Sequence, residues 1–331
     1  GIDEQTKVLE QKYGIPYADE QREAISYALT GGVTVITGGP GTGKTTVIKA
    51  ILDICDILKF SCVLAAPTGR AAQRMFESSG REAKTIHRLL EASIADNGRH
   101  HFQRDEENPI NQKVIIIDEM SMVDTNLMCA LLKAVKLGSY LILIGDPDQL
   151  PPVGPGNCLN DIINSERFNV VKLDKIFRQA EQSLIVMNAH AINRGEMPVL
   201  SSRDNDFFFV ERTGAEDIAS LLLSFVAKRL PERYNADPFD EIQVITCTRK
   251  GSLGTNELNA MFQNALNPKS PKKAEKKYGS VIFREGDKVM QIKNDYDLEK
   301  FKELLKTAPI LKSKIIKIFE EWDVDFEYAT K

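Results

Sequence analysis

The feature that most constrains the fold is a complete GxxxxGK[ST] pattern, which stands between a β-branched segment and an amphipathic one. The pattern reads Gly-Gly-Pro-Gly-Thr-Gly-Lys-Thr over residues 38–45. The sequence V-T-V-I-T precedes it at 33–37, and apolar residues recur at helical spacing over 47–58. A strand, a glycine-rich loop and a helix in this order are typical of a phosphate-binding loop. The segment therefore predicts a nucleoside triphosphate site; a glycine-rich turn without a ligand is the less favoured alternative.

Each residue type in this loop has a physical role toward a polyphosphate. Glycines let backbone N–H groups approach the phosphates without a Cβ clash, and the following helix contributes the positive end of its dipole. Lys44 is predicted to reach the β- and γ-phosphates, and the Thr45 hydroxyl to hold Mg²⁺. The predicted phosphate-binding residues are Gly39, Gly41, Thr42, Gly43, Lys44, Thr45 and Thr46.

The composition is that of an ordinary globular protein. The chain has 331 residues, of which 42% are hydrophobic and 27% charged, and two domains are the default expectation at this length. No apolar run approaches the roughly 20 residues that span a bilayer, and no secretory signal is expected. Five cysteines without CxxC spacing indicate reduced thiols and a cytoplasmic location. With a net charge of −4, nucleic-acid binding would have to come from local grooves.

Four continuously apolar segments, separated by helical ones, predict a doubly wound α/β sheet in the first half of the chain. They span residues 33–37, 62–66, 114–117 and 140–144. Parallel strands that are covered on both faces have this continuous apolar character. Because the loops at the carboxyl ends of such strands meet at one edge of the sheet, we expect the functional side chains there.

The sequence after residue 174 predicts a second α/β unit followed by a helical tail. The elements expected in this unit are three strands and one helix, at 207–210, 242–246, 286–292 and 255–266. A basic, proline-broken loop at 267–277 could touch nucleic acid, but a solvated charged loop is the favoured interpretation. The tail at 300–331 has the pattern of two amphipathic helices.

Polar residues stand at the ends of two predicted strands. Asp118 and Glu119 follow the strand at 114–117. An aspartate beside a phosphate loop is suited to hold the Mg²⁺ shell, and the adjacent Glu119 to orient and deprotonate the attacking water. A helix N-cap pair is the alternative for these two residues. After the strand at 140–144, Gln149 lies in a turn-rich, rigid loop, where it can sense a γ-phosphate.

Taken together, these motifs resemble the RecD-like 5′-to-3′ branch of superfamily 1 helicases, the exodeoxyribonuclease V alpha-subunit type. The matching segments stand in order at 19–21, 38–45, 66–72, 85–90, 117–121, 145–156, 173–179, 248–259 and 285–291. The resemblance implies a P-loop NTPase with a RecA-like motor domain over 1–174 and a partial second RecA-like domain over 175–299. It also implies an ATP-dependent 5′-to-3′ DNA helicase or single-stranded DNA translocase that uses ATP and Mg²⁺ in DNA repair or recombination.

The resemblance assigns roles to single residues. Gln21 would read the adenine edge. Arg178 would reach the γ-phosphate as an arginine finger, for which a surface ion pair is the alternative. The residues that would contact single-stranded DNA are Pro67, Thr68, Arg70, Thr85 and His87. For His87 a structural histidine is an equal alternative. The catalytic residues would be Lys44, Glu119, Gln149 and Arg178, with Thr45 and Asp118 at the metal.

Two motifs that the family carries farther along are not found in this sequence. One is a glycine-rich segment near a small inserted β domain, and the other is a His-Lys-Ser-Gln-Gly-like segment. Their absence favours the alternative of a nucleotide-gated DNA-binding or assembly subunit that does not unwind. An RNA helicase is a further alternative, because no residue indicates reading of a 2′-OH. The expected partners are single-stranded DNA and other subunits of a helicase–nuclease complex, with no membrane.

Overall fold

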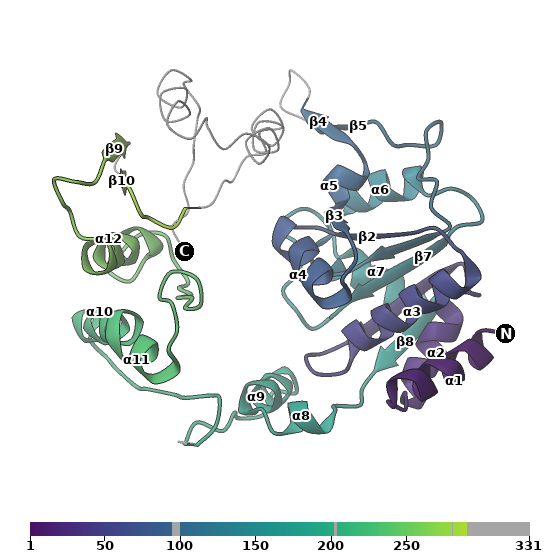
Figure 1. Cartoon of the computed structure of the whole chain (residues 1–331), viewed down its shortest axis with the longest axis horizontal. Helices are drawn as coiled ribbons and strands as arrows, with labels where there is room; N and C mark the ends of the chain where they lie inside the picture. The colour runs from purple at the N-terminus through teal and green to yellow at the C-terminus, as the bar shows by residue number, and fades with distance from the viewer. Residues whose placement is uncertain (95–99, 202–203, 280, 290–331) are drawn as a thin grey trace. The chain divides into compact units, whose positions relative to one another are not determined.

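Figure 1 shows the computed structural model of the chain, which describes residues 1–94, 100–201, 204–279 and 281–289. Contacts within the chain divide it into two compact units, Gly1–Phe209 and Val210–Lys331. The motor domains expected at 1–174 and 175–299 are assigned on motifs, and that assignment stays a prediction.

The first unit is built on a six-stranded parallel sheet with the strand order β3-β2-β6-β7-β1-β8 (Figure 1). Its strands are β1 (Val33–Gly38), β2 (Cys62–Ala66), β3 (Ala83–Thr85), β6 (Val114–Ile117), β7 (Tyr140–Gly145) and β8 (Asn169–Leu173). The four strands predicted from apolar segments are confirmed as β1, β2, β6 and β7, and all neighbouring strands pair in parallel. The parallel-sheet α/β class is therefore confirmed.

Side chains of the central strands alternate between two cores, one on each face of the sheet. Ile116 and Ile142 pack into one core with apolar residues of the helices before β6, and Ile115 and Leu141 pack into the other. Successive side chains of a strand point to opposite faces. Because both faces are covered, the strand sequence is apolar throughout rather than alternating with polar residues.

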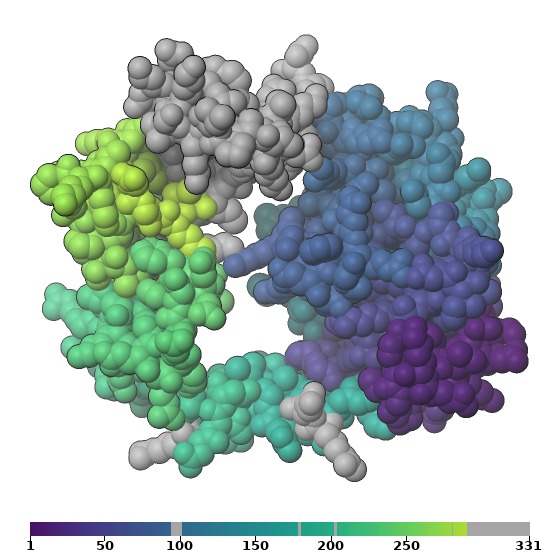
Figure 2. Space-filling model, in the orientation of Figure 1, coloured from purple at the N-terminus to yellow at the C-terminus, as the bar shows by residue number. Residues whose placement is uncertain are grey.

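Helices cover both faces of this sheet. Those contributing to the first core are α1 (Ile2–Tyr13), α2 (Asp19–Ala28), α3 (Lys44–Leu58) and α4 (Gly69–Ser79). Those contributing to the second are α5 (Ile86–Leu89), α6 (Thr125–Ala134) and α7 (Cys158–Asn164). The unit also contains the 3₁₀ turn η1 (Met120–Met122), α8 (Arg178–Glu181) and α9 (Leu184–Asn193). Figure 2 shows the atoms of this unit as a closely packed surface, coloured purple to teal.

A small antiparallel hairpin follows α5 and stands apart from the main sheet. It pairs β4 (Ala92–Ile94) with β5 (His100–Phe102), and Ala92 lies opposite Phe102. The hairpin places the ring of Phe102 near that of His87, with the ring centroids 5.9 Å apart.

The regular structure in the described part of the second unit is mainly helical. Its elements are α10 (Ala215–Ser224), the π-helical turn η2 (Phe225–Arg229), α11 (Leu230–Tyr234), α12 (Thr255–Leu266), β9 (Glu275–Tyr278) and β10 (Val281–Arg284). The predicted helix at 255–266 is confirmed as α12. The strands β9 and β10 form an antiparallel pair, so the basic segment at 267–277 runs from a loop into β9.

Two of the strands predicted after residue 174 do not form. Residues 207–210 and 242–246 have no regular structure, and Phe208 and Ile245 expose 53% and 89% of their surface. A short apolar run becomes a strand only where a neighbouring strand supplies hydrogen bonds, and these runs have no such neighbour among the described residues. The third predicted strand, at 286–292, is irregular over 286–289. Its last residues and the predicted helices at 300–331 lie outside the described residues.

Candidate functional site

The phosphate loop lies where β1 meets α3, at the carboxyl edge of the sheet. Gly41 and Gly43 have φ angles of +77° and +84°, a left-handed conformation that a residue with a Cβ adopts only under strain. Gly43 directly precedes the first residue of α3, so the free N–H groups of the first helical turn face the loop. The backbone is thus shaped to surround an anion.

Lys44 and the threonines of the loop are positioned by the loop itself. The Lys44 ammonium donates hydrogen bonds to the carbonyl oxygens of Gly38 and Gly39. The buried Thr42 hydroxyl donates to the Gly39 carbonyl oxygen at 2.9 Å. Thr45 is exposed and Thr46 half-buried, both in the first turn of α3. The loop therefore presents a cation and an accessible hydroxyl next to its backbone amides.

Asp118 and Glu119 follow β6 as predicted. The backbone N–H of Asp118 donates to the Ala65 carbonyl of the neighbouring strand β2 at 3.0 Å. Burial raises the pKa of the Asp118 carboxyl to about 6. A hydrogen bond from the Glu119 N–H, at 2.8 Å, and the charge of Lys44 lower this pKa, while the Glu119 carboxylate raises it. The carboxylate is thus half-buried, with one hydrogen-bond donor and a nearby cation, a surrounding that would favour a further positive charge.

Glu119 itself has an unusual backbone conformation. Its φ of +55° is left-handed, which is uncommon for a residue with a side chain and costs about 1–3 kcal/mol. It precedes η1 but makes no side-chain capping hydrogen bond. The cap of the following helix α6 is Asp124, whose carboxylate accepts from the Leu127 N–H at 2.8 Å. The geometry therefore gives no support to the alternative that Asp118 and Glu119 are a helix N-cap pair.

A cleft of about 680 Å³ opens over the phosphate loop. Its walls come from β1, the phosphate loop, the start of α3, the loop after β7, β8 and the end of α9. Among the lining residues are Lys44, Asp146, Gln149, Lys172, His190 and Arg194. The structure thus places Gln149 at the same cleft as Lys44. The Gln149 side-chain oxygen accepts from the Ser121 hydroxyl at 3.3 Å, which links the loop after β7 to the segment that carries Glu119.

Gln21 lies on the other side of the phosphate loop, in the first turn of α2. It is buried, and its side-chain oxygen accepts from the Ala18 N–H at 3.0 Å. Its Nε2 has no hydrogen-bond partner among the described residues. A Cβ added to Gly43 would meet this nitrogen and would lie 3.0 Å from a ring carbon of Phe177. An unpaired donor and an aromatic ring therefore meet beside Gly43.

Phe177 was not singled out from the sequence, although it stands inside the Ile-Phe-Arg-Gln motif at 176–179. Its backbone N–H donates to the Gly41 carbonyl oxygen at 3.4 Å, so the segment after β8 lies against the phosphate loop. The next residue, Arg178, begins α8. The Arg178 side chain is outside the described part of the structure, and its role stays a prediction.

A second cleft, of about 1,230 Å³, contains most of the residues predicted to contact DNA. Pro67, Thr68 and His87 line it, together with Phe102, Gln149 and the apolar loop Leu150-Pro-Pro-Val. Two predicted residues are not in its lining. Arg70 is exposed on α4, and Thr85 lies half-buried before α5.

Two of these residues have a clear structural role as well. Thr68 and Thr85 are helix N-caps, whose hydroxyl oxygens accept from Ala71 and Arg88 N–H groups at 3.2 and 3.1 Å. Each hydroxyl keeps its hydrogen for donation to another group. His87 is half-buried, and its ring is tilted against that of Phe102. Both interpretations of His87 therefore stay open.

The donor set beside the phosphate loop suits Mg²⁺. The described residues contain no group of three or more His, Cys, Asp or Glu side chains that could hold a metal ion. Mg²⁺ in nucleotide sites usually takes only one or two protein oxygen ligands and completes its shell with phosphates and water. The Thr45 hydroxyl and the Asp118 carboxylate would supply those ligands. Across the described residues, no helix has both the length and the apolar character needed to cross a bilayer.

Two family models match the chain. A model described as an AAA domain matches residues 21–155, and the SH3 domain model of ATP-dependent RecD-like DNA helicases matches 258–304. The second match contains most of α12 and the β9–β10 pair, a region that the sequence predicts to lie in a second RecA-like domain.

Similar proteins come from several bacteria. The ATP-dependent RecD2 DNA helicase of Deinococcus radiodurans is 34% identical over 92% of this chain and 40% of its own length. The RecBCD enzyme subunit RecD of Mycobacterium tuberculosis is 41% identical, over 44% of this chain and 29% of its own length. That of Mycolicibacterium smegmatis is 30% identical, over 85% and 55%. The chain thus spans about half or less of the length of these relatives. Among solved structures, the Pif1 helicase from Candida albicans aligns with a TM-score of 0.43 and 22% identity, over 63% of this chain and 55% of that one.

Proposed function

Because this chain belongs to the RecD-like helicase family, we propose that it is the ATP-hydrolysing motor part of a DNA helicase or single-stranded DNA translocase. The proposal includes 5′-to-3′ movement and a role in DNA repair or recombination, both of which derive from the family resemblance. The names of the RecD and RecD2 relatives favour this function over a subunit that binds nucleotide without unwinding.

The observation that carries the proposal is that one residue, Gln149, borders two clefts. One cleft contains the phosphate loop, and the other contains Pro67, Thr68 and His87. Gln149 also accepts a hydrogen bond from Ser121, two residues after Glu119. A side chain in this position can respond to a γ-phosphate on one side and alter the wall of a strand-binding cleft on the other. Such a link is what coupling of hydrolysis to movement requires.

The roles proposed for the nucleotide-binding residues follow from their chemistry. The amides of the phosphate loop and the Lys44 ammonium would bind the phosphates, and Gln149 would contact the γ-phosphate. The Glu119 carboxylate would orient the attacking water and accept its proton. Thr45 and Asp118 would hold Mg²⁺, which when bound neutralises charge on the β- and γ-phosphate oxygens. Arg178 is proposed as the arginine finger.

The base of the nucleotide is proposed to lie beside Gly43. There the unpaired Nε2 of buried Gln21 would donate to an adenine ring nitrogen, and the Phe177 ring would stack on the base. An orphaned buried donor costs about 1–3 kcal/mol, and binding of an acceptor would recover it. This supports ATP as the nucleotide.

The second cleft is proposed to bind a single strand of DNA. Its lining of threonine, histidine, proline and aliphatic side chains offers hydrogen-bond donors for phosphates and apolar surface for base faces, and neither contact depends on base sequence. Arg70, exposed on α4, would add a charge for the backbone. We further propose a cytoplasmic location, which the five unpaired cysteines support, and other subunits of a helicase–nuclease complex as partners.

The test is ATP hydrolysis by this polypeptide with and without single-stranded DNA. We expect DNA to stimulate hydrolysis, and Lys44→Ala to abolish it, because the loop would lose the cation that holds the phosphates. The matched control is Lys49→Ala, which changes an exposed lysine on the same helix. Hydrolysis that persists in Lys44→Ala would overturn the site assignment. ATP binding that depends on Lys44, without stimulated turnover, would support the non-unwinding subunit instead. Replacing single-stranded DNA by single-stranded RNA in the same assay tests the alternative of an RNA helicase.

A further inference from the structure

The helix α9 lies directly against the phosphate loop, although 150 residues separate the two contacting groups in sequence. His190, near the end of α9, has its Nε2 3.1 Å from the Pro40 carbonyl oxygen. A carbonyl oxygen can only accept a hydrogen bond, so Nε2 carries the hydrogen in this arrangement. The ring also lines the nucleotide cleft that Lys44 and Gln149 share. An N–H donor that no predicted role uses thus stands at the phosphate end of the site.

The phosphate loop is shaped to receive this helix as well as a nucleotide. A Cβ on Gly39 would lie 2.6 Å from the His190 ring carbon Cε1, and a Cβ on Gly41 would lie 2.5 Å from the Ala180 Cβ. Contacts this short do not occur between real side chains, so Gly41 requires glycine for packing against α8, and a side chain at residue 39 would displace the His190 ring. A small shift of α8 or α9 will therefore displace the phosphate loop, and a shift of the loop will displace these helices.

The far side of α9 is tied to the segment that leads to the second unit. The Asn188 side chain is buried and exchanges two hydrogen bonds with the backbone of Val199, at 3.0 and 2.8 Å. At the start of the helix, Asp206 accepts from the Ser183 hydroxyl and from the Ile185 N–H. Val199 and Asp206 precede Phe209, the last residue of the first unit. Movement of α9 would therefore be passed along the chain toward Val210.

We propose that His190 distinguishes a nucleoside triphosphate from a diphosphate and transmits that difference through α9. The inference rests on the proposed function, since it assumes that this cleft binds ATP. A γ-phosphate oxygen is a charged acceptor, and hydrogen bonds to charged acceptors are about twice as strong as those to a neutral carbonyl. His190 therefore exchanges its bond to Pro40 for one to the γ-phosphate when a triphosphate occupies the loop. A diphosphate gives it no such acceptor, and the bond to Pro40 remains.

The first test measures the dissociation constants of ADP and of a non-hydrolysable ATP analogue for the wild type, His190→Ala and His190→Gln. We expect His190→Ala to raise the dissociation constant of the analogue by about tenfold, which corresponds to the loss of one charge-assisted hydrogen bond. The dissociation constant of ADP should rise by less than about twofold. His190→Gln keeps an N–H donor and should recover part of the difference. His101→Ala, which removes an exposed histidine of the β4–β5 hairpin, is the matched control. Thermal unfolding of each variant checks that it is folded.

Amide hydrogen exchange in α9 and in residues 199–201 and 204–206 gives a second readout. A role of His190 in stabilising the phosphate loop alone would not change exchange in these segments. In the wild type we expect the ATP analogue, but not ADP, to alter exchange there, and His190→Ala to remove the difference. Equal weakening of both nucleotides, or an unchanged affinity ratio in His190→Ala, would overturn the inference. Either result would leave the proposed function intact if Lys44→Ala still abolishes nucleotide binding. If the wild type binds neither nucleotide, the proposed function fails and the inference fails with it.

Discussion

The two units of this chain differ in the interactions that stabilise the interior of each. In the first, large side chains such as Ile36, Ile115 and Ile116 are fully buried on the two faces of a parallel sheet. Among the described residues of the second, the buried ones are Val226, Gly254, Leu258, Asn267 and Arg284. Apolar burial therefore dominates one unit, and polar contacts have a large share in the other.

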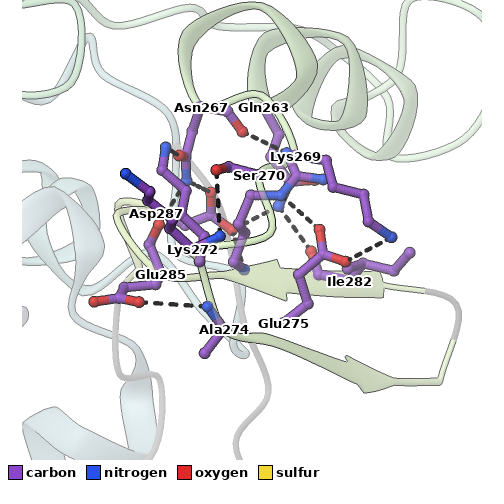
Figure 3. A network of polar contacts seen from close by, with 12 residues as sticks. Gln263, Asn267, Lys269, Ser270, Lys272, Ala274, Glu275, Ile282, Glu285 and Asp287 are labelled. Carbon is purple, nitrogen blue, oxygen red and sulfur yellow. Dashed lines mark hydrogen bonds and ion pairs between the residues drawn. The ribbon is translucent and has the colours of Figure 1, made fainter.

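Figure 3 shows the polar contacts that organise the second unit around the β9–β10 pair. Arg284 is 7% exposed, and its guanidinium donates to the Glu275 carboxylate at 2.7 Å and to the Asn267 carbonyl oxygen. The Asp287 carboxylate accepts from the side chains of Gln263 and Asn267. These bonds join the end of α12 to the hairpin and satisfy polar groups that few apolar side chains cover.

This difference between the units explains why residues in energetically unfavourable states lie in the first unit. A carboxylate with a raised pKa and a glutamate with a left-handed backbone both cost free energy, and both lie at the tip of β6 in the first unit. Such features persist only where the surrounding structure over-determines them. Two packed cores beside β6 supply that constraint.

Glu119→Gln should lower ATP hydrolysis by about 10²–10⁴-fold, because the amide cannot accept a proton from water. Nucleotide binding should change little, because the amide keeps the size of the carboxylate and Lys44 remains. Steady-state hydrolysis and ATP-analogue affinity measure the two effects. Glu257→Gln, at an exposed glutamate on α12 of the second unit, is the matched control. If both variants lose hydrolysis equally, the assignment of the chemistry to the first unit is wrong.

Ile116→Ala should lower the free energy of unfolding by about 2–5 kcal/mol, since it opens a cavity at a fully buried position of β6. Ile245→Ala, at an 89% exposed isoleucine of the second unit, should change it by less than about 0.5 kcal/mol. Urea denaturation followed by circular dichroism compares the pair. Comparable losses would mean that the second unit buries Ile245 and that the contrast between the units does not hold.

Asp118→Asn should stabilise the metal-free protein by about 3 kcal/mol at pH 8. The folded-state pKa of Asp118, about 6, lies above its ordinary value of 3.8, so the folded protein binds more protons than the unfolded chain between these pH values. Stability therefore falls as the pH rises through this window, and the cost is complete above pH 6. Denaturation with EDTA at pH 4 and pH 8 measures it. The gain in the free energy of unfolding of the variant should vanish at pH 4. An equal gain at pH 4 and pH 8 would contradict burial of the charge as the cause.

Arg284→Ala should lower the local stability of the second unit by about 1–2 kcal/mol, because Glu275 and the Asn267 carbonyl lose their buried donor. Hydrogen exchange of the β9–β10 amides should accelerate, while that of β6 should not. Lys276→Ala, at an exposed lysine of the same hairpin, controls for loss of charge. Unchanged exchange in β9 and β10 would show that the contacts in Figure 3 do not hold this unit together.

Ser121→Ala should have the smallest effect. Loss of its hydrogen bond to Gln149, worth about 1 kcal/mol, should lower the ratio of DNA-stimulated to basal hydrolysis by about two- to fivefold. Ser165→Ala removes an exposed serine after α7 and serves as the control. An unchanged ratio would argue that Gln149 is held between its two clefts by the loop alone.

Much of the first unit could be predicted from sequence, because its signals are local. Continuous apolar runs identified β1, β2, β6 and β7, and the spacing of glycine, lysine and threonine identified the phosphate loop. The same logic failed at 207–210 and 242–246, where apolar runs have no neighbouring strand. A short apolar run carries no information about its partner, and strand formation depends on one.

The sequence by itself determined the parallel-sheet class and the residues that follow each strand, since both depend on patterns within a few residues. Only the tertiary structure decided that Gln149 borders two clefts, that Gln21 keeps an unpaired nitrogen beside Phe177, and that His190 reaches Pro40. These contacts join residues far apart in the chain. They depend on the order of the strands in the sheet and on how the segments after β7 and β8 return across its edge, and no local pattern encodes either.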